Sequence, residues 1–453
     1  MAKVAVIGGG LSGLAFAYYL KRHRADYEIR IFEREDIPGG KALTVEENGF
    51  LVEFGVNGVL DNKPSTVGLA SELGVPILSS NENSKKRFAV RDGSLVELPD
   101  APKKFLTSTL LSPYGKLRVM MEPFIPEGSG KDDESLASFA RRRLGQEALD
   151  YLIDPMATGI FAGDPNRLSL KGCFPRIYEL EQGYGSLVKA MIALAKKARK
   201  KGTGKKVTAG PGGTLVSFRG GMKDLVFALK KALSRELICG KAVTEIVKRG
   251  PYDFNLTFHD GTEEECTHVI LACPARDAAV ILKAAIPELA TRCSSIDYPP
   301  IAVVAFGVRP DDVTQDLGGF GFLIPGCEGR SILGTLWDSS IFENRAPEGW
   351  ALLRTLMGGA RRRDIKFLPD SRVTDMAYKE LKELMGLKRP PDFVKVHRWP
   401  HAIPQYNVGH LRLIEEIQRI LKAQPGIFIR TNWVGGVSLN DCIQNSHDLA
   451  RSF

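Results

Sequence analysis

The chain has 453 residues, of which 43% are apolar and 25% are charged, and its formal net charge is +9. This balance is typical of globular proteins, and the length favours two or three domains over a single core. No run of roughly 18 apolar residues free of charge occurs, so no membrane-spanning helix is expected. Seven scattered cysteines without metal-ligand spacing predict reduced thiols and no metal site.

The first 33 residues predict a strand–helix–strand unit. Residues 3–7 form a short apolar run, residues 11–22 have helical spacing, and residues 27–33 alternate as a strand. Two strands joined by one helix have the usual length of a βαβ unit. No signal pattern of basic, apolar and small residues accompanies the first strand, so we expect a cytoplasmic protein.

The rest of the chain alternates between strand-rich and helical regions. A helix is predicted at 66–74, a hairpin turns at Asp92-Gly93, and residues 101–205 have a largely helical pattern. The later predicted elements are a glycine-rich basic loop at 200–213, strands in 214–221 and 241–273, a mixed block over 298–400 that starts with a strand at 301–308, and a strand at 426–432 that leads through a glycine turn into a final helix.

The positive charge gathers in residues 196–206 and in two arginine triplets, Arg141–Arg143 and Arg361–Arg363. These runs fit either solvated helix ends and loops or a surface that attracts anionic lipid or an anionic substrate. Nucleic acid is not expected as a partner, because no aromatic residues interleave with the basic runs. The stretch GTGKK at 202–206 lacks the hydroxyl residue and the first glycine of a phosphate-binding loop.

A glycine motif follows the first predicted strand. Gly8, Gly10 and Gly13 fit the pattern G-x-G-x-x-G, in which the glycines allow a tight turn, close approach of a pyrophosphate, and close packing of helix on strand. The helix N-terminus stabilises the phosphate charge. Glu33, at the end of the second strand, is placed to accept hydrogen bonds from ribose hydroxyls. The motif predicts a dinucleotide, nicotinamide or flavin.

Three further glycine sites favour the flavin. Gly39-Gly40 precede Lys41, Gly55 follows Glu53 in another bare turn, and Gly435-Gly436 precede the final helix. Each site alone fits a simple turn. Together they suit a long dinucleotide held extended between two helix N-termini.

Several longer fragments resemble one known family. The stretches GGGLSGLAFAYYL, IFEREDIPGGKALTVEENGFLVEFG and GGVSLNDCI are similar to the flavin-containing amine oxidase superfamily. Within it, GIFAGDP, FPRIYELE and IPQYNVGH resemble the oxygen-dependent protoporphyrinogen oxidases. The resemblance runs from about residue 3 to residue 450 and is weakest at 100–135 and 195–213.

The expected fold is α/β, with a Rossmann-like, doubly wound FAD-binding domain, a mixed α+β substrate domain and a helical insert. The FAD-binding domain is expected to be discontinuous, over 1–85, 210–295 and 400–453. The helical insert covers 101–205, and the substrate-binding domain joins 86–100 to 296–399.

The resemblance implies oxidation of protoporphyrinogen IX to protoporphyrin IX in haem synthesis. Flavin takes hydride in three rounds, six electrons in all, and oxygen takes the electrons as peroxide, with no metal. Alternatives are coproporphyrinogen III oxidation by the same chemistry, a flavin amine oxidase or desaturase, and a flavin-binding porphyrin carrier without turnover. No general base is assigned, and His397, His401 and His410 are expected to be structural.

The resemblance also implies site residues. Arg87 is expected to hold a substrate propionate, with a planar two-pronged donor that suits a carboxylate. For the apolar wall residues a core role is the alternative. The substrate wall is expected to include Gly159, Phe320, Gly321, Leu323, Leu356 and Met357. The cofactor residues are expected to be Gly8, Gly9, Gly10, Leu11, Ser12, Gly13, Glu33, Arg34, Gly40, Lys41, Gly55, Val56, Asn57, Gly58, Val243, Trp399, Gly436, Val437, Ser438 and Leu439. Lys41 stands where many relatives have arginine or tryptophan.

The helical block resembles the family's membrane-associating region. An apolar face of this block would attach the protein to the inner surface of the cell membrane, and a buried bundle face is the alternative. The face would comprise Phe105, Leu106, Leu110, Leu111, Leu117, Met120 and Met121. The expected partners are a porphyrinogen and O2. The oligomeric state is left open, with a homodimer as a candidate.

Overall fold

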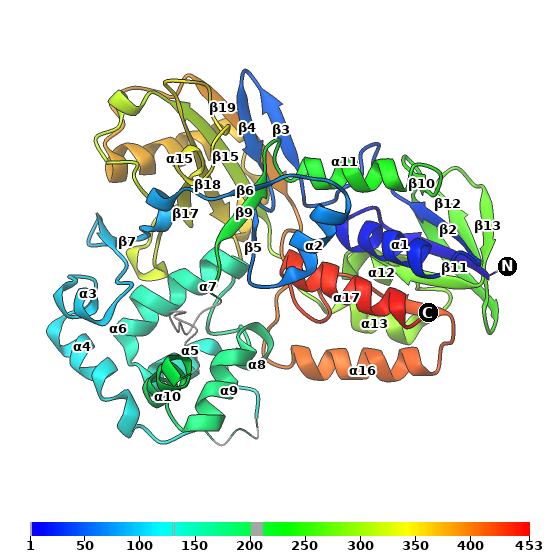
Figure 1. Cartoon of the computed structure of the whole chain (residues 1–453), viewed down its shortest axis with the longest axis horizontal. Helices are drawn as coiled ribbons and strands as arrows, with labels where there is room; N and C mark the ends of the chain where they lie inside the picture. Colours follow the sequence, from blue (N-terminus) through cyan, green and yellow to red (C-terminus); the bar gives the residue numbers. More distant parts are fainter. Residues whose placement is uncertain (1, 129, 131, 201–211) are drawn as a thin grey trace.

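The computed structural model describes residues 2–128, 130, 132–200 and 212–453, arranged in two lobes with a helical region below one of them (Figure 1). The lobe that carries both chain ends holds the predicted dinucleotide motif and is called the dinucleotide-binding lobe, and the other, the second lobe, carries a large mixed sheet (Figure 1). The GTGKK stretch at 202–206 and most of the predicted loop at 200–213 lie outside the described residues.

A parallel sheet lies at the centre of the dinucleotide-binding lobe. Within the described chain it has five strands in the order β10-β2-β1-β14-β20, all paired in parallel. Their bounds are β1 Ala2–Ile7, β2 Tyr27–Phe32, β10 Leu237–Ile238, β14 His268–Leu271 and β20 Ile427–Ile429. Helices cover both faces, which confirms the α/β class and the predicted βαβ unit.

The helices on one face explain the apolar composition of the first helix. α1 (Leu11–His23) is buried along most of its length because it packs between the sheet, α11 (Lys223–Ala232) and α17 (Leu439–Arg451). Figure 1 shows α1 and α17 side by side. The opposite face is covered by α12 (Ala275–Ile281), α13 (Pro287–Ser294) and α16 (His410–Lys422), together with an antiparallel sheet of β11 (Val243–Gly250), β12 (Asp253–Phe258) and β13 (Glu263–Cys266).

The second lobe is built on a mixed sheet that, in the described part of the chain, has seven strands in the order β19-β15-β18-β17-β16-β7-β8. The helix α15 (Asp370–Met385) packs on one face of this sheet. The hairpin between β7 and β8 turns at Asp92 and Gly93, whose φ angles are 51° and 72°, as predicted. The strands are β7 Phe88–Arg91, β8 Ser94–Glu97, β15 Ile301–Val308, β16 Gly321–Leu323, β17 Gly334–Trp337, β18 Ala351–Gly358 and β19 Phe393–Trp399.

All strands of this sheet come from 88–97 and 301–399, within the segments predicted for the substrate domain. The domain bounds themselves stay a prediction. Smaller pieces link the two lobes: the hairpin β3 (Thr44–Glu47) and β4 (Phe50–Glu53), the helix α2 (Pro64–Glu72), and a small sheet of β5 (Val59–Leu60), β6 (Ile77–Ser79) and β9 (Leu215–Phe218).

The predicted helical region is helical. Its helices are α3 Pro102–Thr107, α4 Pro113–Met120, α5 Leu136–Arg143, α6 Gln146–Ala148, α7 Asp154–Phe161, α8 Leu170–Cys173, α9 Pro175–Tyr184 and α10 Leu187–Lys200, and a π-helical turn at Leu149–Ile153 joins α6 to α7. No helix among the described residues is long and apolar enough to cross a membrane.

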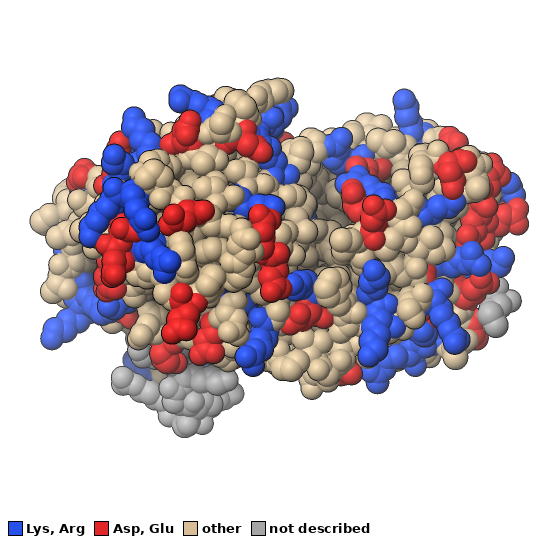
Figure 2. Space-filling model, turned by 90° about the horizontal axis from the view of Figure 1, so that it is seen from above, with Lys and Arg blue, Asp and Glu red and all other residues tan. Residues whose placement is uncertain are grey.

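Five of the six arginines of the two triplets form ion pairs within the protein. Arg143 is fully buried between Glu122 and Glu181. Ion pairs also join Arg142 to Glu134 and Glu181, Arg361 to Asp154, Arg362 to Asp364, and Arg363 to Asp297. These carboxylates neutralise the paired arginines, which favours the alternative that the triplets belong to helix ends and loops without an external anion. Figure 2 shows basic and acidic side chains interspersed over the face that it presents.

Candidate active site

The glycines between β1 and α1 are required by close backbone contacts. Gly8 has φ of 115°, and a Cβ at Gly8 would stand 2.8 Å from the carbonyl oxygen of Ala272. A Cβ at Gly13 would overlap the carbonyl oxygen of Gly8. The first and third glycines of the motif therefore allow the turn and the close packing of α1, as predicted.

Gly10 differs from its neighbours in facing open space. A Cβ added at Gly10 would meet none of the described atoms within 4 Å, and Gly10 is the N-cap of α1. Beside it, Gly39 donates its N–H to the Gly9 carbonyl oxygen at 2.8 Å, and Gly40 has φ of 57°. Bare backbone at Gly10 and at Gly39-Gly40 therefore borders the open space. The N-terminus of α1, with Leu11 and Ser12 in the first turn of the helix, places the positive end of the helix dipole beside this space.

Glu33 lies at the end of β2 and is 7% exposed. Its carboxylate accepts hydrogen bonds from Gly9 N at 2.7 Å and from Glu35 N at 3.0 Å. The carboxylate thus stands at the turn where a dinucleotide ribose is expected. The segment before Val243 runs beside it, because Lys241 N donates to the Glu33 carbonyl oxygen at 2.8 Å. This contact brings Val243, the first residue of β11, towards the same end of the site.

The Gly55–Gly58 segment is a second tightly packed turn. A Cβ at Gly55 would overlap the carbonyl oxygen of Lys41, and one at Gly58 would lie 2.6 Å from that of Val216. Val56 donates its N–H to the Lys41 carbonyl oxygen at 3.3 Å. The segment therefore lies against the Gly39–Lys41 turn, so two of the predicted cofactor turns are adjacent.

The last helix supplies a second N-terminus. Gly435 and Gly436 have φ of 76° and 123°, and a Cβ at Gly436 would lie 2.5 Å from an Asp441 carboxylate oxygen. Ser438 caps α17, and Val437 precedes it. The hydroxyl of Ser446 on α17 donates to the carbonyl oxygen of Ser12 at 2.9 Å, which ties the first turn of α1 to α17. The start of α1 therefore lies against the middle of α17, and the two helices come from opposite ends of the chain.

The side chains of Lys41 and Trp399 are both held by backbone carbonyl groups. The Lys41 ammonium donates to the His401 carbonyl oxygen at 3.0 Å and lies 5.4 Å from the Tyr298 ring centroid. Burial lowers the pKa of Lys41 to about 8. Trp399 Nε1 donates to the Phe54 carbonyl oxygen at 2.8 Å. Arg34, in contrast, is exposed and pairs with Glu35 and Asp277, so its guanidinium is already engaged.

The predicted substrate wall is partly brought together. The Arg87 guanidinium stacks over the Phe320 ring at 5.0 Å, and desolvation lowers its pKa. Gly159 on α7 faces Leu323 on β16, where an added Cβ would stand 3.1 Å from a Leu323 methyl. Gly321, with φ of 124°, lets β16 approach β17 closely. Because β16 pairs with β7, Phe320 and Arg87 share one edge of the site.

Leu356 and Met357 do not share a face. Adjacent residues of a strand point to opposite sides of the sheet. Met357 is fully buried in the core between the sheet and α15, whereas Leu356 points the other way and is partly exposed. The prediction that Met357 lines the substrate wall is therefore wrong, and its core alternative holds.

The histidines of the C-terminal segment have unlike surroundings. His410 stacks on Tyr406 with ring centroids 4.1 Å apart, and burial lowers its pKa to about 4. His397 packs against Trp399 and Phe54, and its Nε2 is buried without a hydrogen-bond partner among the described residues. His410 thus has a structural position, and His397 lies beside the predicted flavin contacts.

Sequence reasoning missed a buried charged cluster behind the Gly55–Gly58 segment. Glu53, Asp338, Arg345 and Arg354 are each at most 3% exposed. Arg354 pairs with both carboxylate oxygens of Asp338, at 2.8 and 3.2 Å. Burial raises the pKa of Glu53 to about 7, although Met222 N and the Thr44 hydroxyl donate to it. The only sequence signal for this buried cluster was the presence of charged residues within or beside apolar strands, where such residues are rare.

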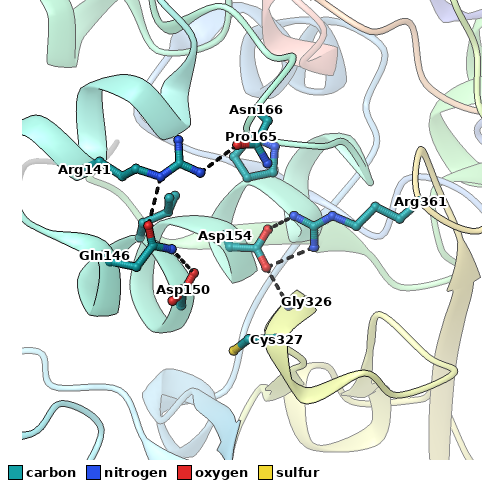
Figure 3. Close-up of a pocket in the computed structure, with 10 residues that line it drawn as sticks. Arg141, Gln146, Asp150, Asp154, Pro165, Asn166, Gly326, Cys327 and Arg361 are labelled. Atoms are coloured by element: carbon teal, nitrogen blue, oxygen red, sulfur yellow. Dashed lines mark hydrogen bonds and ion pairs between the residues drawn. The ribbon is translucent and has the colours of Figure 1, made fainter.

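A small polar pocket of about 200 Å³ lies where α5, α6 and α7 meet the second lobe (Figure 3). Asp154 and Arg361 face each other across it, and Gly326 N donates to Asp154 at 2.6 Å. Within the described residues, its lining contains none of the predicted site residues. Arg361 and Asp154 neutralise each other, and Arg141 and Asp150 both hydrogen-bond to Gln146, so the pocket is a polar seam between the helical region and the second lobe. Figure 2 shows a separate hollow between the two lobes.

The chain matches a protein-family model described as flavin containing amine oxidoreductase over residues 11–451. Two curated relatives align over nearly the whole chain. Coproporphyrinogen III oxidase of Bacillus subtilis is 31% identical, covering 97% of this chain and 95% of the relative. Mitochondrial protoporphyrinogen oxidase of Nicotiana tabacum is 32% identical, covering 100% of this chain and 95% of the relative.

Solved structures agree with these matches. A candidate protoporphyrinogen oxidase from Exiguobacterium sp. 255-15 superposes with a TM-score of 0.85 at 25% identity, covering 100% of this chain and 98% of that one. A reduced UDP-galactopyranose mutase shares the fold, with a TM-score of 0.75 at 16% identity. The glycine turns, the two helix starts and Glu33 fit a flavin dinucleotide. This chain is therefore a member of the flavin-containing amine oxidoreductase family and an FAD-dependent oxidoreductase.

Proposed function

We propose that this protein oxidises a porphyrinogen to the corresponding porphyrin in haem synthesis, with O2 as the electron acceptor. The observation that carries the proposal is the nearly full-length similarity to curated porphyrinogen oxidases of both substrate types. Removal of six hydrogens from one porphyrinogen reduces three O2 to three H2O2, which balances the six electrons. Bound FAD supplies the hydride-accepting chemistry, and the protein supplies orientation and an apolar wall.

The residues of the chain have separable roles in this proposal. The turns at Gly8–Gly13, Gly39–Gly40 and Gly55–Gly58 let the cofactor approach bare backbone, and the helix dipole of α1 favours its phosphates. Lys41 adds a positive charge that favours the pyrophosphate. Phe320, Leu323 and Leu356 offer apolar surface to the macrocycle.

The surroundings of Arg87 favour protoporphyrinogen, which carries two propionates, over coproporphyrinogen, which carries four. Among the described residues Arg87 forms no ion pair and only stacks on Phe320, whereas Arg330, Arg354 and Arg361 are each neutralised by carboxylates. A guanidinium on an aromatic ring, free of acids, suits a propionate. We therefore propose protoporphyrinogen IX as the preferred substrate, with coproporphyrinogen III as the second candidate.

The test measures porphyrin fluorescence under air with each porphyrinogen at matched concentrations. Faster formation of protoporphyrin supports the proposal, and a preference for coproporphyrinogen assigns the second candidate. If the purified protein contains FAD but oxidises neither compound, a carrier without turnover is favoured and the enzymatic proposal fails. Peroxide release measured in the same reaction tests O2 as the acceptor.

Arg87→Ala is expected to raise KM for the porphyrinogen at least tenfold, with kcat changed less than threefold, because loss of a charge-assisted hydrogen bond costs about 1.5–3 kcal/mol of binding. Steady-state fluorescence kinetics measure both constants. Lys85→Ala serves as the matched control, since Lys85 is an exposed neighbouring cation that pairs with Glu82. An unchanged KM in the Arg87 variant would remove Arg87 from the substrate site.

We also propose that the protein attaches peripherally to a membrane through α3, α4 and the turn after them. Leu110 and Leu111 of the predicted face are buried, so the face is smaller than expected there. Tyr114 and Phe124, 78% and 82% exposed, enlarge it elsewhere. The exposed apolar members are Leu106, Tyr114, Leu117, Met120, Met121 and Phe124. Contiguous exposed apolar side chains mark interaction surfaces, and a poorly soluble substrate favours a lipid surface.

Leu117→Ser/Phe124→Ser is expected to lower binding to lipid vesicles at least tenfold, because each side chain contributes ~1.5 kcal/mol or more on burial. Co-sedimentation with phosphatidylcholine vesicles containing about 30% phosphatidylglycerol measures the fraction of each protein that binds lipid. Val280→Ser is the control, since Val280 is 66% exposed on α12 of the other lobe. Equal sedimentation of all three proteins would exclude this surface as the membrane contact.

A further inference from the structure

Three consecutive backbone carbonyl groups lead into the Gly55–Gly58 turn, and side chains from the mixed sheet of the second lobe donate hydrogen bonds to all three. Arg354 on β18 donates to the carbonyl oxygens of Glu53 at 2.7 Å and of Gly55 at 3.3 Å. Trp399 at the end of β19 donates to that of Phe54 at 2.8 Å. The turn that is proposed to contact the cofactor is thus fixed from the other lobe.

Asp338 completes this arrangement. It begins the short helix α14 (Asp338–Ile341), is fully buried, and accepts two hydrogen bonds from the Arg354 guanidinium. It also accepts a longer hydrogen bond, 3.4 Å, from Asn57 Nδ2. Arg354 therefore uses its planar fork on Asp338 and its remaining nitrogen on the turn, a division that an ammonium group cannot reproduce.

The side chain of Asn57 indicates what Arg354 and Asp338 serve to position. Its amide nitrogen is engaged by Asp338, whereas its Oδ1 is buried without a partner among the described residues. A buried amide oxygen without a donor is rare in native proteins. The orphaned acceptor lies in the Gly55–Gly58 turn, so it is available to an N–H donor of a bound ligand.

We propose that Arg354 and Asp338 are positioning residues, which set the Gly55–Gly58 backbone and the Asn57 amide for FAD rather than serving only to hold the two lobes together. The pair reaches the cofactor through the turn and does not contact the reacting atoms. This inference depends on the cofactor contacts proposed for Gly55–Gly58. It does not depend on the porphyrinogen, because FAD binding is measured without substrate.

A double variant separates positioning from stability. Arg354→Met leaves Asp338 as an unpaired buried charge, and such a loss is strongly destabilising. Asp338→Asn/Arg354→Met removes both charges, so no unpaired charge remains, but the donors to the turn stay absent. We expect the melting temperature of the double variant to recover most of what the single variant loses. We expect its Kd for FAD, from fluorescence titration of the apo-protein, to stay at least tenfold above that of the unmodified protein.

Two further variants complete the experiment. Arg330→Met breaks ion pairs with Glu380 and Glu383 on α15, and is expected to lower the melting temperature without changing the Kd for FAD. Arg354→Lys keeps the charge and loses the fork, and is expected to raise the Kd at least threefold and alter the flavin absorption spectrum. This variant decides the question if the double variant does not fold.

The inference is overturned if the double variant recovers both stability and FAD affinity, or if Arg354→Lys binds FAD with unchanged affinity and spectrum. If the unmodified apo-protein takes up FAD but turns over neither porphyrinogen, the substrate proposal fails while this inference stands.

Discussion

Gly10→Ala is expected to leave the fold intact and to lower the affinity for FAD about a hundredfold or more, equivalent to ~3 kcal/mol. A Cβ at Gly10 meets none of the described atoms within 4 Å, and the φ of −70° suits alanine. The methyl group would instead occupy the space that a pyrophosphate needs at the start of α1. Melting of the apo-protein measures the first effect, and fluorescence titration with FAD measures the second.

Gly13→Ala is the matched comparison, because it makes the same chemical change three residues later. Its Cβ would overlap the Gly8 carbonyl oxygen, so α1 would have to move away from β1. Overpacking of this kind costs up to ~3 kcal/mol, and we expect the apo-protein itself to be destabilised. Equal loss of stability in the two variants, or unchanged FAD affinity in the Gly10 variant, would refute the assignment of the open space to the pyrophosphate.

Glu53→Gln is expected to stabilise the protein above pH 7 by up to ~3 kcal/mol relative to the unmodified chain. Burial raises the pKa of Glu53 from 4.5 to about 7 in the folded state. A raised pKa means that the folded state binds the proton more tightly than the unfolded state. The stability from this group is therefore complete below pH 4.5 and is lost as the pH rises through 7. Glutamine resembles the protonated form of Glu53 at every pH, so the variant keeps this stability as the pH rises.

The difference in unfolding free energy between the variant and the unmodified apo-protein, measured at pH 5 and pH 8, checks this result. The difference is expected to grow with pH, because all other titrating groups are shared. Glu46→Gln is the control from the same hairpin, since Glu46 is exposed and Lys223 lowers its pKa. A difference that is constant or shrinks from pH 5 to pH 8 would contradict the raised pKa of Glu53.

Features with local signals could be predicted from the sequence. The Asp92-Gly93 turn needs two residues with positive φ, and the strand–Gly8–Gly13–helix unit needs bare backbone at fixed spacing. Glu33 follows from its distance along the chain from Gly13. The sequence could also have predicted that Leu356 and Met357 lie on opposite faces of the sheet, because adjacent residues of a strand alternate between its two sides.

Long-range partners left no such signal. Arg354 and the Glu53 carbonyl are 301 positions apart, and no local pattern joins them. The arginine triplets appear in sequence as surface charge, since their carboxylate partners come from other segments. Ion pairs neutralise five of the six arginines, although only Arg143 is fully buried.

The central place of β1 in its sheet affects how the protein is synthesised. Its neighbour β2 emerges at once, but β14, on its other side, follows only at residue 268, and β20 at 427. At about 5–20 residues per second, translation leaves one apolar edge of β1 unpaired for roughly ten seconds or longer. Nascent chains of this protein therefore carry an unpaired strand edge during elongation, the kind of surface that is prone to aggregate and that chaperones shield.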